Sequence, residues 1–260
     1  MPISKILINV HDVQRSVDFY VSQLDAEVIG EVTEHSALLD LVTATVRLEH
    51  VIAPEASTWI PDDLQKGFRH VGFKVAAVDP LVARLDAAGV EFHLRPIDAE
   101  GDVRIAFFFD PDGTLLELVE GDLNYHDVIS EDGVARERGL GVPTRPRFDH
   151  IGVTAASLPA IRDRYLPFGF ELIGTIHQVN DPRGFEINYL KGGDTVLEVF
   201  TFDAATTYRT PQLEAQGFSS LTLVAAAAAP LESLGESIGF GSDGSTLFAD
   251  ADGLVFAVAP

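Results

Sequence analysis

Two histidines and two glutamates occupy matched positions in this chain of 260 residues. His70 and His150 each open an alternating apolar run, and Glu117 and Glu198 each lie in a later apolar run. The histidine-to-glutamate separations are 47 and 48 residues. An unpaired carboxylate buried among apolar residues is costly, and a divalent cation would remove that cost. Two imidazoles and two carboxylates suit one ion of Mn, Fe, Ni, Co or Zn and leave room for water or substrate.

The four residues belong to a pattern that occurs four times: a strand-like run, a helix-like segment, then three more strand-like runs. The first runs begin at Lys5, His70, His150 and Ser220. Apolar residues at helical spacing predict helices over residues 13–24, 80–88, 158–165 and 230–238. The sequence therefore predicts an α+β fold of four βαβββ modules.

Strong turn signals precede the last strand of two modules. They are Asp110-Pro111-Asp112-Gly113 and Asp250-Ala251-Asp252-Gly253. Alternation along the following strand places Leu116 and Leu118 on the helix side and Glu117 on the opposite side. The same alternation applies to Glu198. All four candidate ligands are thus expected on the face turned away from the helices.

The outer two modules lack this set. Lys5 and Ser220 stand where the middle modules have histidine, and Ala257 stands in place of a glutamate. Glu49 is the candidate carboxylate of the first module, but no histidine accompanies it. We therefore expect one complete site, formed by the middle modules where the two halves of the chain meet, and one degenerate site.

Three further residues are candidates for contact with a substrate. Lys74 projects on the same face as His70 and could hold an anionic group, or reach solvent at the rim. His93 and His177 lie on the second strands of the middle modules, where they could line the same pocket.

Composition limits the partners. The formal net charge is −22, which disfavours nucleic acids and anionic membranes. The chain has no cysteine, so thiol chemistry and cysteine-bound metals are excluded. No long apolar span and no signal-like leader is visible, which predicts a cytoplasmic location. The expected partner is a small molecule.

The chain divides into two halves in sequence. The segment 123–146 carries several glycines and prolines and fits neither helix nor strand well. We interpret it as a linker between domains at 1–122 and 147–260, each holding two modules.

The modules, together with His70-Val71-Gly72-Phe73-Lys74-Val75 and the Asp110-to-Glu117 segment, resemble the vicinal oxygen chelate superfamily. The resemblance covers nearly the whole chain and implies two tandem glyoxalase-like domains with cupped mixed sheets. Lys5 departs from the histidine usual at its position. In such enzymes one metal binds adjacent oxygens of a substrate, and a carboxylate serves as base. The resemblance therefore implies Glu198, or alternatively Glu117, as the catalytic base of an isomerase or lyase acting as a monomer or homodimer.

Two alternatives stay open. A ring-cleaving Fe(II) dioxygenase is one, although the ligands of two-domain extradiol enzymes would fall here on His150, Ser220 and Ala257, which breaks that pattern. A non-catalytic protein that binds an antibiotic is the other, and the four-residue ligand set argues against it.

Overall fold

A computed structural model describes residues 2–52, 54–224 and 237–259. Each sequence module contributes strands in chain order. The first module holds β1 (Ile3–Val10), α1 (Val13–Leu24), β2 (Glu27–Val28), β3 (Ser36–Asp40) and β4 (Thr45–His50). The second holds β5 (Gly67–Val75), α2 (Val78–Ala87), β6 (Phe92–Ala99), β7 (Val103–Phe109) and β8 (Leu115–Glu120).

The second half repeats this order. The third module holds β10 (Arg147–Thr154), α4 (Leu158–Tyr165), a 3₁₀ turn (Leu166–Phe168), β11 (Glu171–His177), β12 (Glu186–Gly192) and β13 (Thr195–Thr201). The fourth holds β14 (Gly217–Val224), β15 (Ser237–Phe240), β16 (Thr246–Ala249) and β17 (Val255–Ala259). The helix expected over residues 230–238 lies mostly outside the described residues, and its last two positions begin β15.

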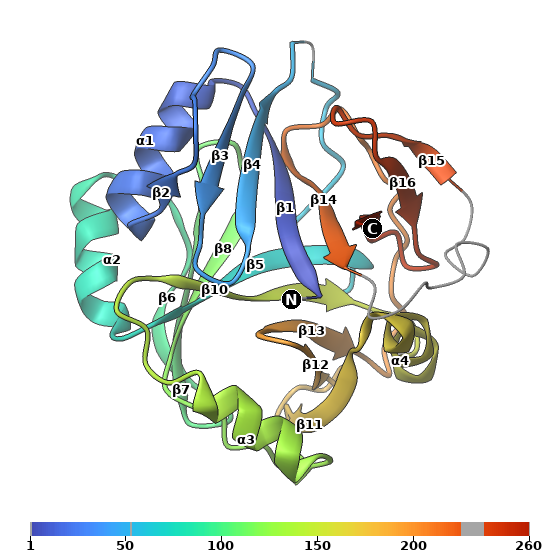
Figure 1. The fold of residues 1–260 in the computed structure, drawn as a ribbon. Coiled ribbons are helices and arrows are strands. Elements are labelled where there is room, and N and C mark those ends of the chain that lie inside the picture. Colours follow the sequence, from blue (N-terminus) through green and yellow to red (C-terminus); the bar gives the residue numbers. More distant parts are fainter. Residues whose placement is uncertain (1, 53, 225–236, 260) are drawn as a thin grey trace.

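The strands form two mixed sheets, which confirms the predicted α+β class. The nine-stranded sheet has the order β6-β7-β8-β5-β10-β13-β12-β11-β9, where β9 is the short strand Asp127–Val128, so it joins the second and third modules. The eight-stranded sheet has the order β15-β16-β17-β14-β1-β4-β3-β2 and joins the first and fourth. In Figure 1 the eight-stranded sheet occupies the upper half, and β11, β12 and β13 lie below it. Each half of the chain thus supplies one module to each sheet, and the boundaries 1–122 and 147–260 remain a proposal.

One buried tyrosine in each half of the chain connects the two modules of that half. Tyr20 of α1 donates a hydrogen bond to Asp110 Oδ2 at 2.9 Å, and Tyr165 of α4 donates one to Asp250 Oδ2 at 2.9 Å. The other oxygen of each aspartate accepts two backbone N–H groups of its own turn. The two predicted turns therefore form as expected, and they also fasten one sheet to a helix of the other.

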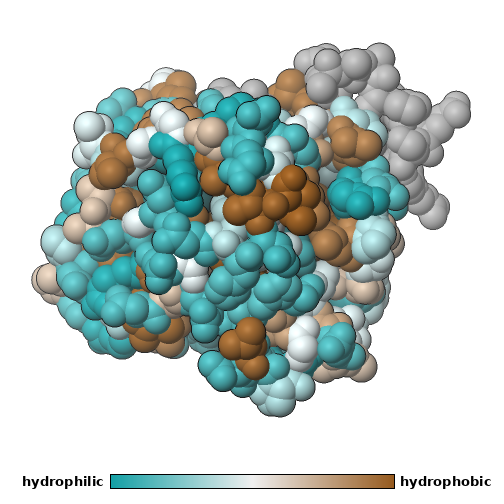
Figure 2. Space-filling model, turned by 90° about the horizontal axis from the view of Figure 1, so that it is seen from below, coloured by the Kyte–Doolittle hydropathy of each residue, from teal (hydrophilic) through white to brown (hydrophobic). Residues whose placement is uncertain are grey.

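One apolar cluster extends through both sheets and α1, α2 and α4. It includes the residues that flank the candidate glutamates: Leu116, Leu118, Leu197 and Val199. The face of Figure 2 is covered mainly by hydrophilic residues with small hydrophobic patches between them. None of the described helices has the length and apolar character needed to cross a membrane.

The segment read as an irregular linker is more ordered than expected. It forms the short β9 (Asp127–Val128), which pairs with β11, and the helix α3 (Glu131–Gly139). Ser130 caps this helix by accepting from Gly133 N. Acidic residues lie in its first turn and basic residues in its last, which suits the helix dipole. The prediction failed here because α3 carries a glycine in its first turn, Gly133, and no apolar stripe.

Candidate metal centre

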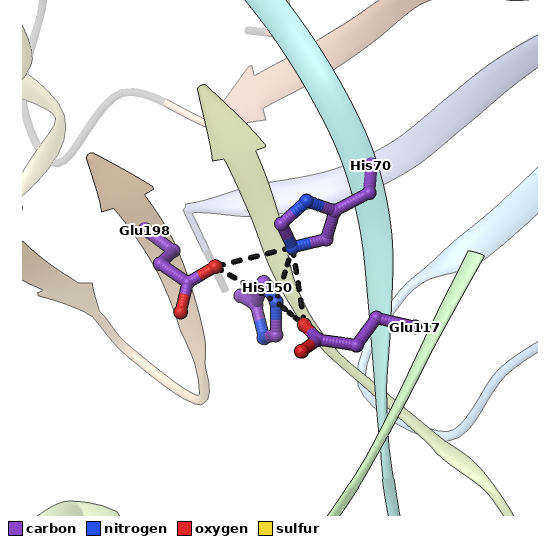
Figure 3. A group of neighbouring side chains, drawn as sticks. All are labelled: His70, Glu117, His150 and Glu198. Atoms are coloured by element: carbon purple, nitrogen blue, oxygen red, sulfur yellow. Dashed lines mark hydrogen bonds and ion pairs between the residues drawn. The ribbon is translucent and has the colours of Figure 1, made fainter. Parts of the chain in front are cut away.

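The four predicted ligands converge at the middle of the nine-stranded sheet (Figure 3). His70 Nε2 lies 2.9 Å from His150 Nε2 and 3.1 Å from an oxygen of Glu117 and of Glu198. His150 Nε2 lies 2.8 Å from Glu117 Oε2 and 3.4 Å from Glu198 Oε2. One ligand atom from each residue lies within 4.8 Å of all the others. Two of the residues come from each half of the chain.

Antiparallel pairing of β5 with β10 explains how the histidines meet. His70 is the register partner of Gly152, and His150 is the partner of Gly72. Each imidazole lies over the opposite glycine: a Cβ at position 72 would be 2.0 Å from His150 Cε1, and one at position 152 would be 2.1 Å from His70 Cε1. The glycines therefore make the room in which the two rings approach each other.

Parallel pairing brings in the carboxylates. Glu117 on β8 is the register partner of Gly72, and Glu198 on β13 is the partner of Gly152. Each glycine thus has a histidine from the other half of the chain on one side and the glutamate of its own module on the other side. The result is a pseudo-twofold arrangement about the β5–β10 pair.

All four side chains are buried, with relative exposures of 1% to 7%. Burial opposes the charged form of both histidines, but Glu117 and Glu198 outweigh it and raise the pKa of His70 and, more strongly, of His150. Burial likewise opposes the charged form of Glu117, but the two histidines outweigh it and lower the pKa of Glu117 to about 2. Without a cation, the side chains therefore favour protonation of an imidazole beside the ionised carboxylates.

A divalent cation fits these residues. Metal–ligand bonds of about 2.1 Å place neighbouring ligand atoms about 3.0 Å apart in an octahedron and about 3.4 Å apart in a tetrahedron. The five distances between ligand atoms given above span 2.8 to 3.4 Å. The donors are the imidazole nitrogens and carboxylate oxygens that such ions take in proteins. A cation would also supply the positive charge that the buried carboxylates require.

Asp149 completes the orientation of one ligand. Its Oδ2 lies 3.0 Å from His150 Nδ1, so it accepts a hydrogen bond that leaves Nε2 free to face the other three ligands. Sequence reasoning overlooked Asp149, although it immediately precedes His150. It also overlooked the glycine two residues after each histidine, which was the available signal for close approach of the strands.

The residues opposite the two glutamates differ, which the sequence reasoning also overlooked. Tyr189 on β12 is the register partner of Glu198 on β13, and burial together with the neighbouring Glu198 carboxylate raises the pKa of the tyrosine hydroxyl well above the usual value. On β7, Phe107 occupies the matching position opposite Glu117 of β8, and its side chain has no hydroxyl. The ring of Phe107 instead packs edge-on against His70, with centroids 5.1 Å apart. The carboxylates are thus equivalent in position but not in surroundings.

The four residues line a cavity of about 490 Å³. Among the residues that the structure describes, all those that line it lie between positions 63 and 200, so the described parts of β1–β4 and β14–β17 do not contribute. Its apolar wall is formed by the side chains Leu94, Ile97, Val103, Ile105, Phe107, Leu115, Val119, Phe185, Ile187, Val196 and Phe200. The site therefore combines charged ligands with largely apolar surroundings.

The three candidate substrate contacts divide between the cavity and the surface. Lys74 lines the cavity, but its ammonium donates to Gly121 O and lies 3.7 Å from Asp122. His93 lines the cavity from an exposed position on β6. His177 does not line it, in contrast to the expectation, because Glu186 and Asp127 hold its ring beside a separate shallow hollow.

The register of the outer sheet corrects one assignment. Lys5 pairs with Thr222 and Leu7 with Ser220, which matches the pairing of β5 with β10. Leu7 also pairs with Arg47, as Gly72 pairs with Glu117, so Arg47 and not Glu49 occupies the first-module carboxylate position. Glu49 lies two residues further along and pairs with Arg47 in a salt bridge. Ala257 pairs with Thr222 and holds the predicted fourth-module position.

Comparison with known proteins agrees with this architecture. The profile of the Glyoxalase/Bleomycin resistance protein/Dioxygenase superfamily matches residues 3–118. The uncharacterized protein YwkD of Bacillus subtilis (strain 168) is 33% identical over 122 residues, which is 45% of this chain and 95% of that protein. The uncharacterized protein YaeR of Escherichia coli (strain K12) is 41% identical over 54 residues, 21% of this chain and 42% of that protein.

Solved structures share the fold over the whole length. Glyoxalase I from Zea mays superposes with a TM-score of 0.69 at 16% identity, covering 99% of this chain and 91% of that one. A protein described as a putative dioxygenase from Bacillus subtilis gives a TM-score of 0.63 at 16% identity, covering 100% and 84%. The chain belongs to the Glyoxalase/Bleomycin resistance protein/Dioxygenase superfamily, the vicinal oxygen chelate group that its repeated modules resemble.

Proposed function

We propose that this protein is a metal-dependent enzyme that moves a proton on a carbon next to a carbonyl, in an isomerisation, epimerisation or elimination. The observation that carries the proposal is the buried set of His70, Glu117, His150 and Glu198, which lines a cavity of about 490 Å³. A bound divalent ion would supply Lewis acidity toward adjacent substrate oxygens. Four protein ligands leave fewer free positions than the three-ligand iron sites of oxygen-activating enzymes, which favours proton transfer over the dioxygenase alternative.

The chain's own residues provide a base. A carboxylate that accepts a proton has to turn from its ligand position toward the substrate, and inside a buried site it needs another polar partner there. The Tyr189 hydroxyl supplies that partner for Glu198. Phe107 supplies none for Glu117. We therefore propose Glu198 as the base and Glu117 as the residue that stays in place.

The cavity suggests the kind of substrate. Its volume of about 490 Å³ suits a small molecule. Its mainly apolar wall would pack against a hydrocarbon or aromatic part, while polar substrate oxygens would lie at the four ligands. His93 at the rim and Lys74 deeper in the wall are the proposed polar contacts away from the ligands.

Metal content tests the first part of the proposal. Protein purified in buffers without added metal, then stripped with a chelator and reloaded, should bind one Mn²⁺, Co²⁺, Ni²⁺, Zn²⁺ or Fe²⁺ per chain. His150→Ala should weaken that binding by more than about 100-fold, because it removes a ligand and leaves two carboxylates unbalanced. His177→Gln is the matched control, since this histidine lies outside the cavity, and it should bind normally.

Proton exchange tests the second part. Incubation of the loaded enzyme in D₂O with hemithioacetals, 3-oxo thioesters and catechols should label a carbon-bound position in one of the first two classes, without O₂. Glu198→Gln should abolish labelling while one metal per chain is retained. Strictly O₂-dependent turnover of a catechol would assign the protein to the dioxygenases instead. Tight ligand binding by a chain that takes up no metal would support the non-catalytic alternative.

A further inference from the structure

A second cavity, of about 430 Å³, lies where the two sheets adjoin, and it shares no lining residue with the metal centre. It is bounded by residues 54–59, by Phe68 of β5, by the turn at 112–114, and by residues 209–218 leading into β14. These segments come from both halves of the chain. The cavity is therefore a separate feature with its own chemistry.

Arg209 is the one basic residue among the described residues that line this cavity, beside the acidic Glu55 and Asp112. The other 17 of the 18 lysines and arginines each have a hydrogen bond, ion pair or comparable contact. Within residues 2–52, 54–224 and 237–259, the Arg209 side chain has neither a hydrogen bond nor an ion pair, and its Nε is buried without a partner. Burial lowers the pKa of Arg209, yet a guanidinium stays charged in proteins. An unpaired cation in a chain of net charge −22 is unexpected.

The two acidic residues of the same lining, Asp112 and Glu55, already accept hydrogen bonds from other residues. Asp112 accepts hydrogen bonds from Ser16, from His11 N and from Gln216, and it pairs with Arg15. Glu55 accepts from Gln212. Neither carboxylate forms an ion pair with Arg209. The charge of Arg209 is thus available to a ligand that enters the cavity.

Flat apolar surfaces line the same space. Phe68 and Phe218 stack with ring centroids 3.8 Å apart and planes within 2°. Trp59 lies against this pair, with centroids 6.4 Å from Phe68, and its indole N–H is occupied by Phe68 O. Phe218 and Trp59 are partly exposed, so their rings contribute to the lining. The Oγ1 atom of Thr114, a lining residue that is 1% exposed, is buried without a hydrogen-bond partner among the described residues.

We infer that this cavity binds a small organic monocarboxylate with a flat apolar body, whose carboxylate pairs with Arg209 while its ring packs against Trp59 and Phe218. A single charge matches the single unpaired guanidinium, which can bind a carboxylate through two parallel hydrogen bonds. A dianion such as phosphate would bring a charge that the surrounding acidic surface does not balance. This site is independent of the proposed reaction at the metal centre.

Trp59 provides a built-in reporter, because it is the one tryptophan in the chain. Titration with phenylacetate or 3-phenylpropanoate, excited where these compounds do not absorb, should change its fluorescence in a saturable manner. The neutral amides of the same acids should bind at least about tenfold more weakly, since they lack the charge-assisted bonds to Arg209. Isothermal titration calorimetry on the same protein gives a second measurement of binding that does not depend on fluorescence.

Variants assign the response to the cavity. Arg209→Gln should weaken carboxylate binding at least about tenfold and remove the preference over amides, while Arg209→Lys keeps the charge and part of the affinity. Arg162→Gln is the control, because Arg162 is exposed and pairs with Asp163 on the surface. Thermal melting of each variant verifies that it folds.

Two results would overturn the inference. One is the absence of saturable binding by either carboxylate in both measurements. The other is a dimer, seen by sedimentation, whose association Arg209→Gln weakens while carboxylates do not bind, because a second copy of the chain would then occupy the cavity.

Discussion

The two sheets have the same central geometry and opposite chemistry. In the nine-stranded sheet, His70, Gly72 and Glu117 face His150, Gly152 and Glu198 across the β5–β10 pair. In the eight-stranded sheet the corresponding residues are Lys5, Leu7, Arg47, Ser220, Thr222 and Ala257. Two cations replace one histidine and its carboxylate, and their charges are balanced by Asp243 and Glu49.

The difference extends beyond the ligands. Both glycines that admit an imidazole are replaced by larger residues in the outer sheet, and Leu38 and Leu247 stand opposite Arg47 and Ala257 where the inner sheet has Phe107 and Tyr189. Outside the inner four residues, no other group of histidines and carboxylates able to hold a metal occurs in the described part of the chain. The comparison teaches that the backbone alone does not make the site; the space beside the strands is as necessary as the ligands.

The glycines offer the largest test of this difference. Gly72→Ala or Gly152→Ala places a Cβ about 2 Å from an imidazole, so the ring must move. We expect a loss of about 1–3 kcal/mol in unfolding free energy together with loss of the tight metal site. Urea unfolding and metal titration measure the two effects.

Matched substitutions show whether the effect is specific. Gly139→Ala meets no atom within 4 Å and should change neither quantity much. Thr222→Ala, at the outer position equivalent to Gly152, should leave one metal per chain. Normal metal binding by both glycine variants would mean that close approach of the rings is not required.

The turns of Asp110 and Asp250, one in each half, should respond alike to pH, whereas the centres of the two sheets differ in chemistry. Burial, with contributions from neighbouring charge, raises the pKa of Asp110 from 3.8 to about 6, and burial raises the pKa of Asp250 in the same direction. The protonated form is therefore favoured in the folded state. For Asp110, the stabilising contribution of the protonated form is complete below about pH 4 and is lost as the pH rises through about 6.

Asparagine at position 110 cannot ionise, yet it retains a carbonyl oxygen for the two turn N–H groups. Relative to the unsubstituted protein, Asp110→Asn should gain up to about 3 kcal/mol in unfolding free energy between pH 4 and pH 7. Asp250→Asn should change in the same direction. Parallel pH profiles for variant and parent in urea unfolding would contradict the raised pKa of Asp110.

Asp149 allows a smaller test confined to the inner sheet. Asp149→Asn weakens the hydrogen bond that orients His150, and we expect metal affinity to fall about 10- to 100-fold. Ser219 holds the equivalent position before Ser220 in the outer sheet, and Ser219→Ala should leave the affinity unchanged. A competing chelator of known strength gives both numbers. Equal affinities for Asp149→Asn and its parent would remove Asp149 from the site.

The smallest expected effect separates the two glutamates. Tyr189→Phe removes the hydroxyl beside Glu198, and we expect kcat to fall about tenfold with little change in KM or metal content. The reciprocal Phe107→Tyr places a hydroxyl opposite Glu117 and should not restore kcat in Glu198→Gln. Restoration would transfer the role of base to Glu117.

Local patterns in the sequence predicted much of this arrangement. Alternation along single strands correctly separated the four ligands from the core, and the Asp-x-Asp-Gly turns formed as expected. The comparison of the four modules also predicted that the second and third modules meet at the site, but alternation does not reveal which strands become neighbours, so the direct pairing of β5 with β10 was visible only in the structure. Alternation also leaves the register open by two residues, which is how Glu49 was preferred to Arg47.

Other features depend on contacts distant in sequence. Tyr189 reaches Glu198 only because β12 pairs with β13 in one register. His177 faces away from the cavity because β9, in the segment expected to be irregular, brings Asp127 beside it. The helix α3 forms where Gly133 packs against Ile173, and helical periodicity in the sequence does not predict this contact.

Covalent linkage of β5 and β10 within one chain has a consequence for concentration. A site assembled between separate subunits falls apart on dilution, whereas here both halves are held at a high effective concentration by the chain that joins them. The metal centre should therefore survive at protein concentrations where any dimer would dissociate. Linkage also allows the two halves to differ in sequence. Glu198 can therefore face Tyr189 while Glu117 faces Phe107. Two identical subunits related by symmetry could not carry this difference.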